Sequence, residues 1–120
     1  MNLEYFLQKV LLTWESFGDE YVVRLPLIMP GGSNATVRII PKGNRYYVGD
    51  LGLAFQEADS MGYKASFWRT ADALVQKARL ERNQTELGIL VSSEDLYNAV
   101  CEVALVSWKV ANAVGSLQEG

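Results

Sequence analysis

Apolar residues follow two different periods along the chain. Over the first 14 residues they recur at every third or fourth position, which predicts an amphipathic helix that ends near residues 16–18. Four later segments are rich in β-branched and aromatic residues and predict strands at 21–29, 35–40, 45–48 and 87–91. Pro26 has no N–H to donate, so the first strand should lie at a sheet edge or contain a bulge. The apolar stripe of the first helix consists of Leu3, Phe6, Leu7, Val10, Leu11 and Trp14.

Helical spacing returns in the middle of the chain. The segment 49–52, with the sequence Gly-Asp-Leu-Gly, leads into a helix that Gly62 closes, and Ser66 is a suitable N-cap for the next one. A strand-to-helix step such as 49–52 can bind phosphate, but this one lacks the remaining residues of a nucleotide-binding loop. We therefore expect Asp50 to cap the helix.

The last predicted helix differs from the others in its composition. Ser92 and Asp95 resemble a capping box, and the segment 96–114 that follows is apolar over most of its circumference. Such a helix lies either at the centre of a core or in an interface with a partner. For the second of these arrangements we predict a homodimer whose contact is formed by Tyr97, Cys101, Leu105 and Trp108.

These elements define an α+β fold with the order α-β-β-β-α-α-β-α. Short turns join the first three strands, which favours antiparallel pairing. We therefore expect a four-stranded, mostly antiparallel sheet packed against helices, with a long apolar C-terminal helix. A chain of 120 residues forms one core, so residues 1–120 are predicted to be a single domain.

Composition removes several classes of function. The chain has no histidine and one cysteine, which excludes imidazole catalysis, an internal disulfide and a thiolate metal cluster. Four carboxylates in the middle of the chain, at Asp50, Glu57, Asp59 and Asp72, have no spacing that makes them converge on a metal. We expect no catalytic residue, no metal and no cofactor. No signal peptide or membrane span is predicted, which indicates the cytoplasm.

Charge is distributed unevenly along the chain. The formal net charge is -3, yet residues 24–82 carry nine basic and five acidic residues. Three of these arginines fall on neighbouring predicted strands, with two tyrosines beside the last, and such a sheet face can stack bases and neutralise phosphates. The alternative is a solvated face with the tyrosines packed under helices. The candidate binding face consists of Arg24, Arg38, Arg45, Tyr46 and Tyr47.

Residues 21–62 resemble a bacterial and phage family of small domains of unknown function. The resemblance rests on a strand with an apolar-Pro step, a Gly-rich loop, a strand of alternating Val and Ile, and an Asp-x-Gly step into a helix. The segment 92–114 is similar to the closing helix of that family. The family supplies no catalytic residue, and implies a protein of prophages or mobile elements. The matching positions are Pro26, Gly31, Gly32, Val37, Ile39, Tyr47, Asp50, Gly52 and Gly62.

These observations predict a small protein that is not an enzyme and acts by binding a macromolecular partner. One class of target is a host component that handles nucleic acid or provides defence, since acidic surfaces compete for basic patches. The alternative is a nucleic-acid-binding module that uses the basic and aromatic sheet face.

Overall fold

The computed structural model describes residues 13–119 and is an α+β fold with an antiparallel sheet. Three helices pack on this sheet, and a 3-10 turn precedes the last of them. The strands are β1 (Thr13–Phe17), β2 (Glu20–Ile28), β3 (Asn34–Lys42), β4 (Arg45–Gly49), β5 (Glu81–Asn83) and β6 (Glu86–Ser92). The helical elements are α2 (Leu53–Ser60), α3 (Lys64–Ala78), the turn η1 (Ser93–Asp95) and α4 (Leu96–Glu119).

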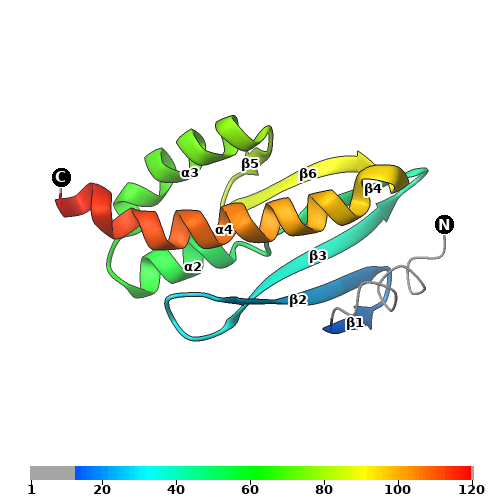
Figure 1. The fold of residues 1–120 in the computed structure, drawn as a ribbon, viewed down its shortest axis with the longest axis horizontal. Coiled ribbons are helices and arrows are strands. Elements are labelled where there is room, and N and C mark those ends of the chain that lie inside the picture. The colour runs from blue at the N-terminus through cyan, green and yellow to red at the C-terminus, as the bar shows by residue number, and fades with distance from the viewer. Residues whose placement is uncertain (1–12, 120) are drawn as a thin grey trace.

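The sheet has the order β1-β2-β3-β4-β6-β5, with antiparallel pairing between all neighbours. Strands β1 to β4 form a meander because short turns join them, as antiparallel neighbours allow. The helices α2 and α3 follow β4, and the β5–β6 hairpin then returns the chain to the sheet beside β4 (Figure 1).

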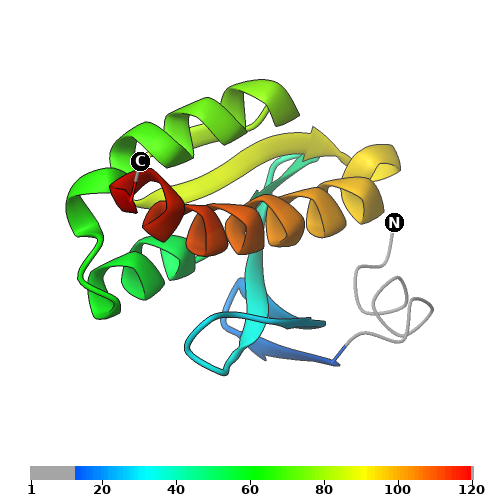
Figure 2. The same ribbon diagram turned by 60° about the vertical axis from the view of Figure 1, so that its left-hand side comes forward.

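All three described helices pack on the same face of the sheet (Figures 1 and 2). Strand alternation directs Val37 and Ile39 of β3 toward them, and both side chains are fully buried. Helix α4 packs over β2, β3, β4 and β6 and also contacts α2 and α3. Its buried residues Val100, Val103 and Val110 place it in the centre of the core, which explains its apolar composition.

Within residues 13–119 the sheet has six strands and not the four that the sequence predicts, so the predicted order of elements is wrong in two places. Residues 13–17, predicted as the end of the first helix, form strand β1, while the helical stripe before residue 13 lies outside the described residues. A tight turn at Gly18 pairs β1 with β2, and the ring of Trp14 lies 5.9 Å from that of Tyr21. Cross-strand pairing therefore determines this segment more strongly than its helical spacing.

The second missed strand is β5, which has only three residues. It carries no alternating apolar pattern and exists because a two-residue turn, with Gln84 at φ 57°, pairs it with β6. The predicted N-cap of α3 is also wrong. The helix begins at Lys64, and the Ser66 hydroxyl donates to the carbonyls of Tyr63 and Val114, which ties α3 to α4.

The expectation for Pro26 is confirmed in one of its two forms. The pairing of β2 with β3 shifts register between Arg24 and Ile28, so the strand contains an irregularity around the proline. The strand itself is not at the edge, because it lies between β1 and β3. Its pairing with β1 nevertheless ends at Arg24, so Pro26 lies beyond the last residue that β1 pairs.

Candidate functional site

The face of the sheet opposite the helices, here named the open face, carries most of the predicted binding residues. Cross-strand partners point to the same face, and the pairs Arg38↔Gly49 and Ile40↔Tyr47 lie opposite the buried pair Ile39↔Val48. By the same alternation Arg24, Arg38, Arg45 and Tyr47 share this face, whereas Tyr46 points toward the helices and packs against the core. The structure thus separates the two tyrosines that the sequence leaves undecided. The open face consists of Glu15, Phe17, Glu20, Val22, Arg24, Arg38, Ile40, Arg45, Tyr47, Glu86 and Leu90.

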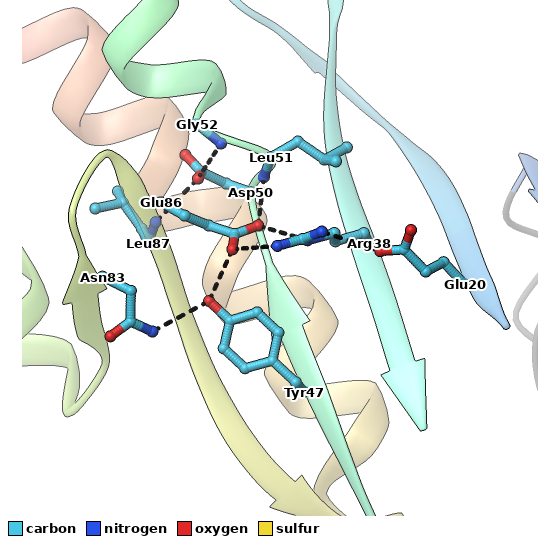
Figure 3. A network of polar contacts seen from close by, with 9 residues as sticks. All are labelled: Glu20, Arg38, Tyr47, Asp50, Leu51, Gly52, Asn83, Glu86 and Leu87. Atoms are coloured by element: carbon cyan, nitrogen blue, oxygen red, sulfur yellow. Dashed lines mark hydrogen bonds and ion pairs between the residues drawn. The ribbon is translucent and has the colours of Figure 1, made fainter. Parts of the chain in front are cut away.

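Arg38 is the centre of a network of charged side chains on the open face (Figure 3). Its Nε and Nη2 donate to the two carboxylate oxygens of Glu86, each at 2.8 Å, and its Nη1 donates to Glu20 at 2.9 Å. The two parallel bonds to Glu86 are the strongest geometry available to an arginine–carboxylate pair. The hydrogen bond to Glu86 is the main cause that raises the pKa of Arg38.

Glu86 gathers further donors around the same carboxylate. The Tyr47 hydroxyl donates to Oε1 at 3.0 Å, and the backbone N–H of Leu51 donates to Oε2 at 3.0 Å. The Glu86 side chain is only 13% exposed, so little water reaches its carboxylate. The hydrogen-bond donors around it therefore stabilise its negative charge in place of water. The pKa of Tyr47 is raised to about 12, mainly because the hydroxyl is buried, and the nearby negative charge of Glu86 acts in the same direction.

Two glycines that face each other across β4 and β6 make room for this network. A Cβ atom at Gly49 would lie 2.4 Å from Oε2 of Glu86, and one at Gly88 would lie 2.5 Å from the Tyr47 hydroxyl oxygen. Sequence reasoning missed Glu86. The available signal was a glycine in each of two strands, because glycine inside a strand often marks a close approach by another group.

Asp50 lies beneath the network, on the helix side of the same turn. Its carboxylate accepts hydrogen bonds from the N–H groups of Gly52, Ala54 and Leu87 and from the Ser107 hydroxyl, at 2.9 to 3.2 Å. The side chain is fully buried, which raises the pKa of Asp50, while the four donors act in the opposite direction. The N-cap position of α2 is Gly52, and Asp50 lies two residues before it. Asp50 nevertheless caps the helix start as expected, because its carboxylate accepts from the N–H of Ala54 and its carbonyl from the N–H of Leu53.

The other acidic residues of the middle segment lie at separate places. Glu57 accepts a hydrogen bond from the N–H of Gly31 at 3.0 Å, whereas Asp72 pairs with Arg82 across α3 and β5. Asp59 is exposed on α2. Within residues 13–119 no three acidic or cysteine side chains gather as metal ligands would.

The predicted self-association stripe lies along one side of α4. Trp108 donates its ring N–H to the carbonyl of Ile28 at 3.0 Å, so a hydrogen bond connects α4 to the end of β2. Cys101 and Leu105 are half-buried and Tyr97 is exposed. The packing of α4 in the core accounts for most of its apolar surface, so the homodimer stays a prediction.

Comparison with other proteins does not change this picture. No family model, no curated protein and no solved structure matches the chain. The resemblance to a phage family therefore stays a prediction. In the part of the chain that the structure describes, no helix has the length and apolar composition needed to cross a bilayer.

Proposed function

We propose that this protein acts by binding a protein partner through the open face and performs no catalysis. The observation that carries the proposal is a face that combines exposed apolar side chains with charged groups already paired to one another. Phe17 is 55% exposed, Leu90 is 44% exposed, and Leu51 at the rim is 39% exposed. Apolar area of this kind contributes to association when a partner removes it from water.

The pairing of the arginines favours a protein over a nucleic acid as the partner. Arg24 donates to Glu15 at 3.0 Å, and Arg38 is held by Glu20 and Glu86. A phosphate would have to compete with these carboxylates, which lie within hydrogen-bond distance of the same nitrogens. Arg45 is exposed and forms no ion pair with any described residue, so it alone of the three arginines is available to a phosphate.

The resemblance to a phage family suggests which class of partner the protein binds. A small protein of a mobile element that binds a host nucleic-acid-handling or defence component fits this proposal. Protein surfaces that bind nucleic acid carry an excess of basic residues, and the two ends of this chain carry an excess of acidic ones. Nucleic-acid binding by the open face is the second candidate, supported by Arg45 and Tyr47.

The test is affinity capture from a bacterial lysate with nuclease present, using the wild-type protein and three folded variants. We expect a discrete protein to be retained by the wild type and lost with Phe17→Lys and with Ile40→Lys, which place a charge on the open face. Met61→Lys is the matched control, because Met61 is also exposed but follows α2 on the helix side. Partner capture that is unaffected by both open-face variants would contradict the proposal.

A second measurement addresses nucleic acid directly. If Arg45→Glu abolishes binding to single-stranded DNA or RNA, and that binding weakens steeply with salt, the second candidate replaces the first. The expected result under our proposal is that neither nucleic acid binds at physiological salt.

A further inference from the structure

The two sides of strand β6 are paired unequally. On one side residues 88–92 pair with β4, whereas on the other side β5 pairs only with residues 86–88. The sheet order ends at β5, so residues 89–92 form a sheet edge with no described strand beside them. Figure 1 shows β6 continuing past the end of the short β5.

The hydrogen bonds of Leu87 show which backbone groups point out from this edge. Its N–H donates to the Asp50 carboxylate at 3.0 Å and its carbonyl accepts from the Asp50 N–H at 2.9 Å, so both groups point toward β4. Backbone direction alternates along an antiparallel strand. The N–H and carbonyl groups of Leu90 and Ser92 therefore point away from β4, where a further strand could pair with them.

A groove of about 440 Å³ lies beside this edge, on the helix side of the sheet. Ile89 and Val91 of the same strand line part of it, and both are half-buried. The side chains of an added strand would alternate between this groove and the opposite face. The groove is lined by Ala78, Arg79, Leu80, Ile89, Val91, Asp95, Asn98, Ala99 and Glu102.

The charged residues that line the groove have an acidic balance, with the two carboxylates of Asp95 and Glu102 and the one guanidinium of Arg79. An apolar side chain suits the apolar lining residues Ile89 and Val91, and a basic side chain two positions away in an extended chain points to the same side and suits the carboxylates.

We propose that β6 accepts an extended segment of a partner protein as an additional strand, with an apolar side chain in the groove and basic side chains two positions on either side of it. In this arrangement Leu90 donates and accepts the first pair of backbone hydrogen bonds, and the groove selects the side chain. Strand addition of this kind combines affinity from the main chain with specificity from the side chains. The edge offers backbone groups that point sideways out of the sheet, whereas the open face consists of side chains, that of Leu90 among them. This inference therefore does not rest on the function proposed above.

The probe is the capped heptapeptide Thr-Lys-Thr-Val-Thr-Lys-Thr, titrated into the intact isotope-labelled protein and followed by NMR and amide hydrogen exchange. We expect the amides of Leu90 and Ser92 to exchange at least roughly tenfold more slowly in the complex. Replacing both lysines of the peptide with glutamate should weaken binding by about tenfold, and replacing the valine with glycine by a similar factor.

Two variants of the protein separate the backbone from the groove. Leu90→Pro removes an N–H that points away from β4 and should abolish binding, while the matched variant Leu90→Ala retains that N–H and should bind. Ala99→Leu should fill the groove and weaken binding by about tenfold or more even if Leu90→Pro does not fold.

Four results would overturn the proposal. The first is a folded Leu90→Pro variant that binds as well as the wild type, and the second is protection of amides in β1 to β4 with none at Leu90 and Ser92. The third is the absence of any spectral change at peptide concentrations of about 1 mM. The fourth is a protein that is a dimer without peptide and becomes a monomer in the Leu90→Pro variant. That result would show that the edge pairs with a second copy of this chain. Phe17→Lys should leave peptide binding unchanged, so failure of the open-face proposal is distinguishable.

Discussion

Two carboxylates hold the same turn from opposite faces of the sheet, and they do so by different means. Asp50 is fully buried and relies on four neutral donors, three from the backbone and one from Ser107. Glu86 is partly exposed and is paired with Arg38, with Tyr47 and the N–H of Leu51 completing its partners. Both carboxylates contact residues 51–54, where Leu51 and Gly52 have positive φ angles of 61° and 70°.

The difference shows how one turn is stabilised on the face of the sheet that the helices cover and on the open face that water reaches. On the helix side no cation is needed, because preorganised N–H groups at a helix start stabilise a negative charge. On the open face water competes for Glu86, and the bidentate arginine limits that competition. A leucine in the left-handed conformation costs roughly 1–2 kcal/mol, and the two carboxylates offset that cost at this turn.

The largest effect is expected from Asp50→Ala. The variant leaves three backbone N–H groups and one hydroxyl buried without an acceptor, so we expect the free energy of unfolding to fall by about 3–4 kcal/mol. Urea denaturation followed by circular dichroism measures this loss. A loss below that of Glu86→Ala would show that the buried carboxylate is the less important of the two.

Gly88→Ala should cause the next largest loss in the free energy of unfolding. The added Cβ would lie 2.5 Å from the carbonyl oxygen of Val48, a backbone atom that cannot move without disturbing β4. We expect a loss of about 1–3 kcal/mol from this overpacking. Gly49→Ala is the matched variant, because the atoms nearest its Cβ belong to the side chains of Glu86 and Tyr47 and not to the backbone. These side chains can shift at the expense of their hydrogen bonds without moving β4, so the variant should cost less. Equal losses in denaturation experiments would contradict this account of the two glycines.

Glu86→Gln retains the shape of the side chain and removes its charge. Its amide nitrogen would face donors of Arg38, so we expect a loss of about 1–2 kcal/mol. Glu15→Gln weakens the exposed pair with Arg24 and should change stability by less than about 0.5 kcal/mol. A double-mutant cycle of Glu86 with Arg38 gives the coupling, and a value near zero would reject the network as a stabilising unit.

The smallest effect concerns pH and Tyr47. Its pKa of about 12 in the folded protein lies above the ordinary value of 10.0, so the unfolded chain ionises first as pH rises. Stability should therefore be unaffected by Tyr47 below pH 10 and should decrease between pH 10 and about 12. Stability measured against pH should decline less steeply in Tyr47→Phe than in the wild type. Identical slopes would show that the hydroxyl is not held in the network.

The predicted strands show what the sequence pattern can determine. In the predicted strand 35–40 apolar and polar residues alternate, and in the structure Val37 and Ile39 point inward while Arg38 points outward, as such alternation requires. The pattern failed for β1 and β5, because Trp14 satisfied a helical stripe and the three residues of β5 carry no apolar alternation. Both strands exist through pairing with a neighbour, which a local pattern does not contain.

The sequence by itself determined the α+β class, the inward residues of the central strands and the capping role of Asp50, because periodicity and local hydrogen bonding are properties of short segments. Only the tertiary structure brought Glu86 to Arg38, 48 residues away in the chain, and left residues 89–92 as a sheet edge beside a groove. Both features depend on the position of β6 beside β4 in the sheet. The β5–β6 hairpin takes that position because it packs together with α4, and this packing depends on the free energy of the whole core, which no short segment of the sequence contains.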